Sequence, residues 1–196
     1  MTIDVYVPPN VEDGVKVWQY GGFNEVGGTT YPLYDGCHLA TDSIAVAFSY
    51  HVGPLGFFAL ESAGIKGNMA IHDALAALQW VQTNIASFGG NKSQVVLFGQ
   101  SSGGDDTFVI STLPQAKRLI SAAIVELGGG QFVTPYNVAQ EVGVGYAATL
   151  NCSVKDVSQD LFAYIRRLFL LNDKFCWLAD DIRRLPAHMP AISIVR

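Results

Sequence analysis

The sequence predicts an α/β fold in which a mostly parallel central sheet is flanked by helices. Short and almost wholly apolar segments at residues 43–50 and 95–98 are typical of strands buried on both faces. A helical period, with apolar residues three or four positions apart, runs between them over residues 68–88. Strands that alternate with helices in this way form parallel sheets with helical crossovers.

The first half of the chain gives four elements in order. Residues 2–7 alternate between apolar and polar and end at Pro8 and Pro9, which predicts an edge or hairpin strand. Residues 15–20 form a second strand and lead into a glycine-rich loop at 21–28; the buried strand at 43–50 follows. The helix that comes next has Asn68 as its N-cap and Gly89 with Gly90 as its stop. Its expected buried face is Ile71, Leu75, Leu78, Val81, Ile85 and Phe88.

The second half continues with the strand at 95–98 and a helix to about residue 113, which Pro114 ends. Residues 121–127 form a further strand, apolar enough to need a neighbour. No convincing strand follows it, so it is expected to be an open edge of the sheet. Helices are predicted at 136–150 and 157–171. Residues 174–196 show no clear period and receive no assignment.

Composition excludes two classes of protein. Of the 196 residues 49% are apolar and 15% are charged, below the roughly 25% usual for soluble domains, as expected of a piece of a larger domain. A net charge of −5 without a cluster of Lys or Arg argues against nucleic-acid binding. The longest apolar runs have five residues, far fewer than the ~18 that cross a bilayer, so no membrane span is expected.

The cysteines do not indicate a metal site. Cys37, Cys152 and Cys176 cannot all pair with one another, and none has the spacing of a zinc site. No cofactor is expected. The first residues lack the basic stretch and apolar region of a signal peptide, although sequons at Asn91 and Asn151 suit a secreted protein. Oligomeric state and localisation stay open.

A G-x-S-x-G pentapeptide spans residues 99–103 and places Ser101 between an apolar strand and a helix. Glycines two residues before and after a serine leave room for neighbouring backbone on a tight turn. The start of the helix directs backbone N–H groups, that of Ser102 first, at a developing oxyanion. The alternative is a glycine-rich turn without chemistry or a phosphate loop, but the pattern fits neither G-x-G-x-x-G nor a Walker loop. Ser101 is therefore the candidate nucleophile.

A second element supports this interpretation. The strand at 15–20 ends in Gly21, Gly22 and Phe23, where small residues allow a backbone N–H to approach a substrate oxygen. Such a sequence alone is more often a plain turn. Together with the pentapeptide it predicts an oxyanion hole made of Gly21, Gly22 and Ser102.

Several segments together resemble the type-B carboxylesterase and cholinesterase family, and the loop YPLYDG at 31–36 is similar to its fungal members. The matching segments are DVYVP at 4–8, VWQYGGF at 17–23, VGPLGF at 52–57, GN at 67–68, LQWVQTNIASFGG at 78–90 and FGQSSGG at 98–104. The resemblance implies an α/β-hydrolase fold and hydrolysis of small-molecule carboxylic esters, with Ser101 as the nucleophile. It extends over about residues 4–172, so the chain is expected to be a partial domain of this family. The resemblance is compatible with secretion and leaves the localisation open.

The chain departs from the family pattern at four places. Relatives commonly have three glycines before the Phe, so the N–H groups that face the substrate stay open among Gly21, Gly22 and Phe23. Gln100 stands where the family commonly has Glu, which removes a negative charge that would attract a cationic substrate. Leu127 replaces a serine. Where relatives carry the second half-cystine, this chain has Tyr164, so Cys152 is expected to lack a partner.

A serine hydrolase also needs a base and a carboxylate, in the chain order Ser, acid, His. His188 follows Ser101, with Asp180 or Asp181 between them, so the order is formally correct. The few residues from Asp181 to His188 cannot hold the helix and strand that normally separate acid and base. The sequence therefore favours a chain cut before its acid and base over a compact triad of Ser101, Asp181 and His188. The other histidines are expected to be loop, strand-end or helix residues: His38, His51 and His72.

Three functions remain in competition. The first is a serine carboxylic-ester hydrolase that works through an acyl-enzyme. The second is a non-catalytic cholinesterase-like interaction domain, against which the intact pentapeptide argues because such relatives usually lack the nucleophile. The third is a degenerate, inactive fragment, which Leu127 and the unassigned tail favour.

Overall fold

The computed structural model describes residues 1–11, 14–130, 133–149 and 191–195. They belong to two compact units, each described by itself. The described part of the first unit comprises residues 1–11, 14–56, 69–130, 133 and 191–195. That of the second comprises residues 57–68 and 134–149.

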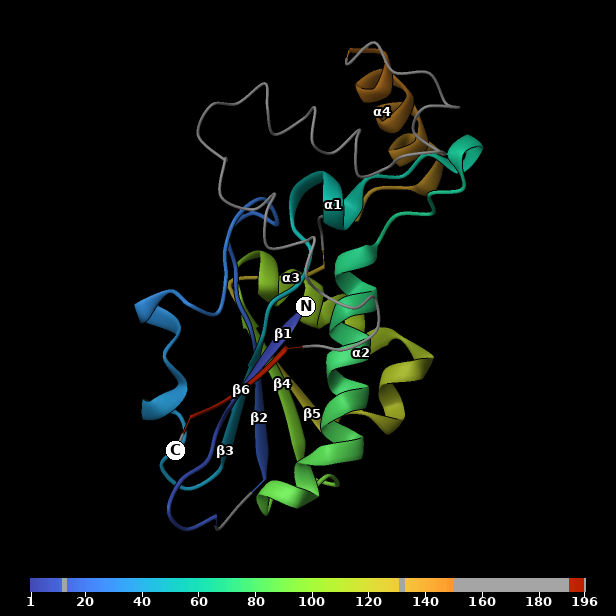
Figure 1. Ribbon diagram of the computed structural model, residues 1–196. Helices are drawn as coiled ribbons and strands as arrows, with labels where there is room; N and C mark the ends of the chain where they lie inside the picture. Colours follow the sequence, from blue (N-terminus) through green and yellow to red (C-terminus); the bar gives the residue numbers. More distant parts are fainter. Residues whose placement is uncertain (12–13, 131–132, 150–190, 196) are drawn as a thin grey trace. The chain divides into compact units, whose positions relative to one another are not determined.

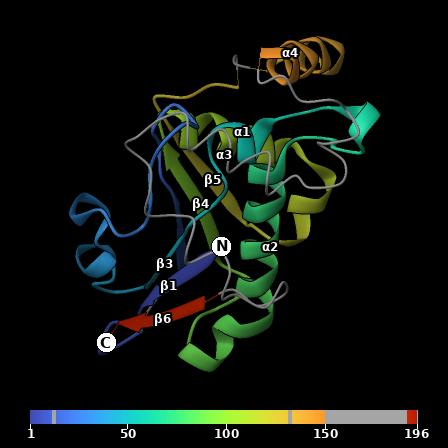
Figure 2. The same ribbon diagram turned by 45° about the horizontal axis from the view of Figure 1, so that its top comes forward.

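The first unit is built on a six-stranded sheet with the order β5-β4-β2-β3-β1-β6 (Figures 1 and 2). Every neighbouring pair is parallel except β1 and β3, which are antiparallel. The mostly parallel sheet predicted from the sequence is therefore confirmed. The strands are β1 (Thr2–Tyr6), β2 (Val15–Gln19), β3 (Ile44–Phe48), β4 (Val95–Gln100), β5 (Ala122–Glu126) and β6 (Ala191–Val195).

The central strands form the core. All five residues of β3 are buried, as its continuous apolar sequence predicted. In the register of the sheet Val17 of β2 lies between Val46 of β3 and Leu97 of β4, and all three side chains are buried. These strands therefore hold the carboxyl ends of β2 and β4 side by side.

Helix α2 (Met69–Asn84) and the 3-10 turn η4 (Ile85–Phe88) lie on one side of the sheet, and the turns η1 (Pro32–Tyr34) and η2 (Gly36–His38) lie on the other (Figures 1 and 2). The helical segment ends as predicted, since Gly89 has φ 87°. Its most buried side differs from the prediction. Leu78, Val81 and Ile85 are buried, but Ile71, Leu75 and Phe88 are half-buried, and the remaining fully buried positions are alanines: Ala70, Ala74 and Ala77. Small side chains let this helix pack closely, so the large residues are displaced to its flanks.

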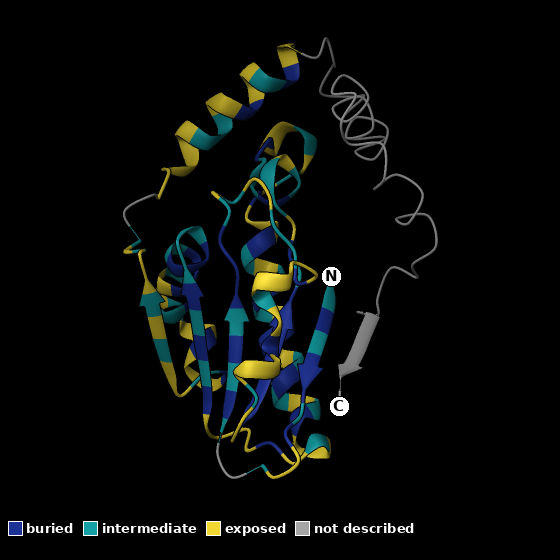
Figure 3. Ribbon diagram, turned by 90° about the vertical axis from the view of Figure 1, so that its left-hand side faces the viewer, coloured by how far each residue is buried: buried dark blue, intermediate teal, exposed yellow. Residues whose placement is uncertain are grey.

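The prediction that β1 is an edge or hairpin strand is wrong. β1 pairs with β3 on one side and with β6, from the tail that the sequence left unassigned, on the other. β5 is an edge of the sheet, as predicted, because no described strand lies beyond it; β6 is the other edge strand. Along β5 exposed and intermediate residues alternate, as the edge strand in Figure 3 shows.

The second unit contains the 3-10 turn η3 (Glu61–Ala63) and helix α4 (Tyr136–Thr149), which confirms the helix predicted at 136–150. The Glu61 N–H donates to Gln140 Oε1 over 2.6 Å. The short helix α1 (Gly53–Phe57) stands at the boundary of the two units. The helix predicted at 157–171 lies outside the described residues. Among the helices that the structure describes, none has the length and apolarity needed to cross a bilayer.

Candidate active site

Ser101 stands between the end of β4 and the first residue of helix α3 (Ser102–Thr112). Its backbone has φ 57° and ψ −129°, a conformation that L residues adopt only when the surrounding structure enforces it. A serine at a helix start usually accepts a hydrogen bond from the first turn, but Ser101 makes no such cap. The strained strand-to-helix turn expected from the pentapeptide is present, and the Ser101 hydroxyl is not used to cap its own helix.

Two glycines of the pentapeptide make this turn sterically possible. A Cβ atom added at Gly103 would lie against two backbone carbonyl oxygens, that of Gln19 at the end of β2 and that of Tyr20, which follows it. A Cβ at Gly99 would lie against the carbonyl of Gly103. The start of α3 therefore packs directly on backbone, which fixes Ser101 relative to the end of β2.

The glycine-rich loop after β2 touches the candidate nucleophile. A Cβ at Gly21 would stand 2.6 Å from the Gln100 carbonyl oxygen and 2.9 Å from the Ser101 Cβ, closer than real side chains approach. The two sequence features that suggested an oxyanion hole therefore lie together at the carboxyl ends of neighbouring strands.

The hydrogen bonds of this loop limit which N–H groups can face a substrate. The N–H groups of Glu25 and Val26 donate to the Gly22 carbonyl over 3.0 and 3.1 Å, and that of Asn24 donates to Ser102 Oγ over 3.0 Å. Within the described part of the chain, the N–H groups of Gly22 and Phe23 make no hydrogen bond. The Ser102 N–H belongs to the first turn of α3, whose N–H groups have no partner within the helix.

Two tyrosines connect the start of this loop to the segment that follows β3. The Tyr50 hydroxyl donates to the Tyr20 carbonyl over 2.5 Å, and the Tyr50 N–H donates to the Tyr20 hydroxyl over 3.2 Å. Their rings are stacked with centroids 4.4 Å apart. Burial raises the pKa of Tyr20 to about 12 and raises that of Tyr50 as well, so both hydroxyls keep their protons at neutral pH.

Two carboxylates of α3 accept hydrogen bonds from segments that lie near the Ser101 turn. Asp105 Oδ1 accepts from the N–H groups of Gly129 and Gly130, which follow β5, over 2.8 and 3.1 Å. Asp106 is 5% exposed and accepts from Gln19 Nε2 and Asn24 Nδ2, each over 3.1 Å.

Sequence analysis did not single out Asp106, although a signal for it exists. It lies three residues after Gly103 and four before Ile110, so it shares their buried helix face. A carboxylate in such a position is buried and needs hydrogen-bond partners.

The described histidines occupy the places predicted for them: His38 ends η2, His51 follows β3, and His72 lies in α2. His51 Nδ1 stands 2.5 Å from Asp73 Oδ2, and its backbone N–H donates to the same oxygen over 2.8 Å. In the part of the chain that the structure covers, no hydrogen bond links either residue to Ser101.

Asp181 and His188, the alternative triad partners, lie outside the described residues, as do Cys152, Cys176 and Tyr164. Cys37 is exposed and forms no disulfide.

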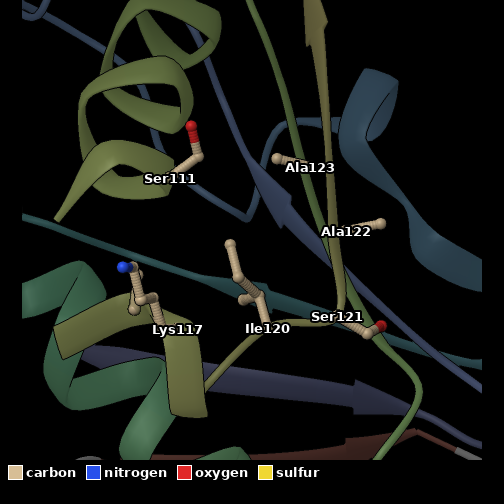
Figure 4. Close-up of a pocket in the computed structure, with 7 residues that line it drawn as sticks. Ser111, Lys117, Ile120, Ser121, Ala122 and Ala123 are labelled. Carbon is tan, nitrogen blue, oxygen red and sulfur yellow. The ribbon is translucent and has the colours of Figure 1, made fainter. Parts of the chain in front are cut away.

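A hollow of about 190 Å³ lies elsewhere on the first unit, between α3, the 3-10 turn η5 (Pro114–Arg118) and the start of β5 (Figure 4). Because β4 and β5 are parallel, the start of β5 is at the end of the sheet opposite to Ser101. The Ser121 hydroxyl in this hollow donates to the Val95 carbonyl over 2.9 Å. We therefore do not assign the hollow to the candidate active site.

A mostly parallel sheet flanked by helices, with a serine on a strained turn from strand to helix, defines the α/β-hydrolase class. The chain belongs to the Carboxylesterase family, whose family model matches residues 1–169.

Relatives and solved structures agree with this assignment. The chain is 37% identical over 143 residues to the para-nitrobenzyl esterase of Bacillus subtilis (strain 168), a match that covers 70% of this chain and 29% of that protein. It is 40% identical over 194 residues to the cholinesterase of Mus musculus, covering 93% of this chain and 32% of that protein.

Among solved structures, PNB esterase superposes with a TM-score of 0.77 at 30% identity, covering 87% of this chain and 37% of that one. Juvenile hormone esterase from Manduca sexta, with OTFP covalently attached, gives a TM-score of 0.71 at 29% identity, covering 76% of this chain and 29% of that one. The chain spans about a third of the length of the relatives it matches.

Proposed function

We propose that this chain is the nucleophile-bearing part of a serine carboxylic-ester hydrolase domain that acts on small-molecule esters. Ser101 Oγ attacks the ester carbonyl carbon, the alcohol leaves, and water hydrolyses the resulting acyl-enzyme. The observation that carries the proposal is the backbone of Ser101, which is held at φ 57° with Gly21 packed against it. The function requires no cofactor of its own.

We assign the oxyanion hole to the backbone N–H groups of Gly21, Gly22 and Ser102. Support comes from the loop's hydrogen bonds, because Asn24, Glu25 and Val26 have their N–H groups engaged and residues 21–23 are left to face a substrate. Donors from two segments can converge on one oxygen here, since Gly21 touches Ser101. The loop at 31–36 supports placing the chain with the fungal-type members of the family.

A fluorophosphonate probe tests the proposed nucleophile. We expect it to label the chain at Ser101, mapped by peptide mass spectrometry, and Ser101→Ala to abolish the label. Ser111, also in this region of the chain but inside α3, should remain unlabelled and serves as the internal control. A chain that folds but carries no label at Ser101 would contradict the proposal and favour an inactive fragment or an interaction domain.

The second test concerns the base. We expect residues 1–196 alone to hydrolyse p-nitrophenyl butyrate orders of magnitude more slowly than the full-length para-nitrobenzyl esterase, because without an oriented base only the oxyanion hole and binding contribute. His188→Ala should leave this slow rate unchanged. Rapid turnover that His188→Ala abolishes would instead establish the compact triad of Ser101, Asp181 and His188.

A further inference from the structure

The buried carboxylate of Asp106 is the meeting point of a polar network beside the candidate active site. Its Oδ2 accepts from the side-chain amide of Gln19, the last residue of β2, over 3.1 Å. Its Oδ1 accepts from the side-chain amide of Asn24, in the glycine-rich loop, over 3.1 Å. One carboxylate on α3 therefore binds both the strand that leads into the loop and the loop itself.

Asn24 is attached to α3 at two points. Its side chain donates to Asp106, and its backbone N–H donates to Ser102 Oγ over 3.0 Å. Asn24 follows Gly22 and Phe23, whose N–H groups make no hydrogen bond to other described residues. A residue fixed at both its backbone and its side chain limits the positions that its immediate neighbours can take.

This stretch of the loop needs such a restraint. Gly22, Phe23 and Asn24 have φ values of 129°, 57° and 58°, three successive residues in the left-handed region. For non-glycine residues this conformation persists only where neighbouring contacts enforce it. Phe23 supplies little restraint itself, because its side chain is 85% exposed. The contacts from Asn24 to α3 restrain this stretch, together with the turn in which Glu25 and Val26 donate to the Gly22 carbonyl and the hydrogen bond from the Gly53 N–H to the Asn24 carbonyl over 2.5 Å.

The network also requires a carboxylate at position 106. Both incoming groups are N–H donors, so both oxygens of residue 106 must accept. The remaining amide oxygens, Gln19 Oε1 and Asn24 Oδ1, are buried without a partner among the described residues. An amide at residue 106 would accept one donor and present a donor to the other, so one arm is lost or its amide must turn over, and neither arm then ends on a charged acceptor.

We propose that Asp106 is a positioning residue that holds the oxyanion loop Gly21–Asn24 on helix α3 beside Ser101. The inference rests on the proposed function, and Asp106 acts through Asn24 rather than on the ester. Burial raises the pKa of Asp106 to about 6, with Asp105 adding to the rise and the two amide donors opposing it. The titratable groups that interact with it are Asp105 on α3 and Tyr50 after β3. At pH 7.5, above this value, the carboxyl is ionised and both of its oxygens can accept.

Hydrogen exchange on the whole chain at pH 7.5 tests the proposal without using activity. We expect Asp106→Asn to speed the exchange of amides in residues 21–26 about tenfold or more, the factor that loss of a hydrogen bond to a charged group gives. Asp105→Asn is the matched control, because Asp105 binds Gly129 and Gly130 instead, and residues 21–26 should exchange as in the wild type.

Adding Asn24→Asp to Asp106→Asn should restore slow exchange. In this double variant the residue 106 amide donates to the new carboxylate and still accepts from Gln19.

Three results would overturn the proposal: unchanged exchange in Asp106→Asn, failure of the double variant to restore it, or equal acceleration in the strands β2 and β4, which would make Asp106 a residue of general stability. Fluorophosphonate can fail to label the wild-type chain while exchange in residues 21–26 responds to the variants as expected. That combination would overturn the proposed function and leave this inference standing.

Discussion

Ser101 carries backbone strain at the turn between β4 and α3. Its φ of 57° with ψ of −129° costs a non-glycine residue about 1–3 kcal/mol. We expect Ser101→Gly to be more stable than Ser101→Ala by about 1 kcal/mol, because alanine keeps the strain and glycine relieves it at the expense of some chain entropy. Urea unfolding of the two variants measures the difference.

Ser111, in the regular part of α3, provides the control for this comparison. There glycine should be less stable than alanine by about 1 kcal/mol, the ordinary helix preference. The order of the two variants must therefore reverse between positions 101 and 111. The same order at both positions would mean that the turn is not strained.

The contribution of Asp106 to the free energy of unfolding should also change with pH. Its pKa rises from 3.8 to about 6 on burial, so between these values the folded chain holds a proton that the unfolded chain has lost. The stability that Asp106 contributes is present below about pH 4 and is lost as pH rises through 6, by about 3 kcal/mol in all. Asp106→Asn removes this dependence.

The measurement is the free energy of unfolding of wild type and Asp106→Asn from pH 4 to 7.5. We expect the difference between them to shift in favour of the variant as pH rises from about 4 to about 6, and to stay constant above that. The difference between wild type and Asp105→Asn should change much less over the same range, because Asp106 titrates in both chains. A constant difference between wild type and Asp106→Asn across the range would contradict the buried, titrating carboxylate.

At the scale of elements, the close packing of α3 on β2 positions the nucleophile turn. A Cβ at Gly103 would meet two backbone carbonyl oxygens of residues 19 and 20, which cannot move as a side-chain end can. We expect Gly103→Ala to lower the free energy of unfolding by about 1–3 kcal/mol, the usual cost of overpacking, and to slow fluorophosphonate labelling of Ser101. Chemical denaturation and labelling kinetics measure the two effects.

Gly145 in α4 is the matched control for this substitution, because a Cβ there meets nothing within 4 Å. Gly145→Ala should stabilise the chain by up to about 1 kcal/mol through helix preference alone. If Gly103→Ala were equally harmless, the contact between α3 and β2 would not be what fixes Ser101.

The elements that sequence analysis predicted correctly are those whose signal is local. β3 is a continuous apolar run, and the helical segment 68–88 is periodic and ends at a glycine that adopts a positive φ. The strained turn at Ser101 was predictable because its glycines flank it within five residues. The alanine-lined face of α2 was missed because the closest packing favours small side chains, whereas hydrophobic periodicity weights large ones.

The features that sequence analysis missed depend on contacts between distant residues. β6 pairs with β1 from the opposite end of the chain, and no local pattern in residues 174–196 indicates this. The Asp106 network joins β2, its loop and α3, and a single aspartate on a helix is ordinarily read as a surface residue. The nucleophile was thus predictable from the sequence, whereas the residues that position its surroundings were not.

At the scale of the whole molecule, the described part of the first unit has a sheet with two edge strands, β5 at one side and β6 at the other. Exposed strand edges pair with other chains, and an apolar edge residue strengthens this tendency. Ile124 in the middle of β5 is 51% exposed. These observations together indicate self-association through β5.

We therefore expect the chain to form soluble oligomers or aggregates whose proportion rises with concentration. Ile124→Lys should shift it toward the monomer, because a charged side chain on an edge strand opposes pairing. Leu33 in η1 is an apolar residue that is 85% exposed and does not belong to the edge strand. Leu33→Lys therefore removes a comparable apolar side chain from another part of the surface and should have little effect. Sedimentation velocity over a tenfold range of concentration measures the change. A wild-type chain that stays monomeric over this range would show that its β5 edge is protected in solution. Equal effects of the two substitutions would assign the association to apolar residues of the surface in general rather than to this strand.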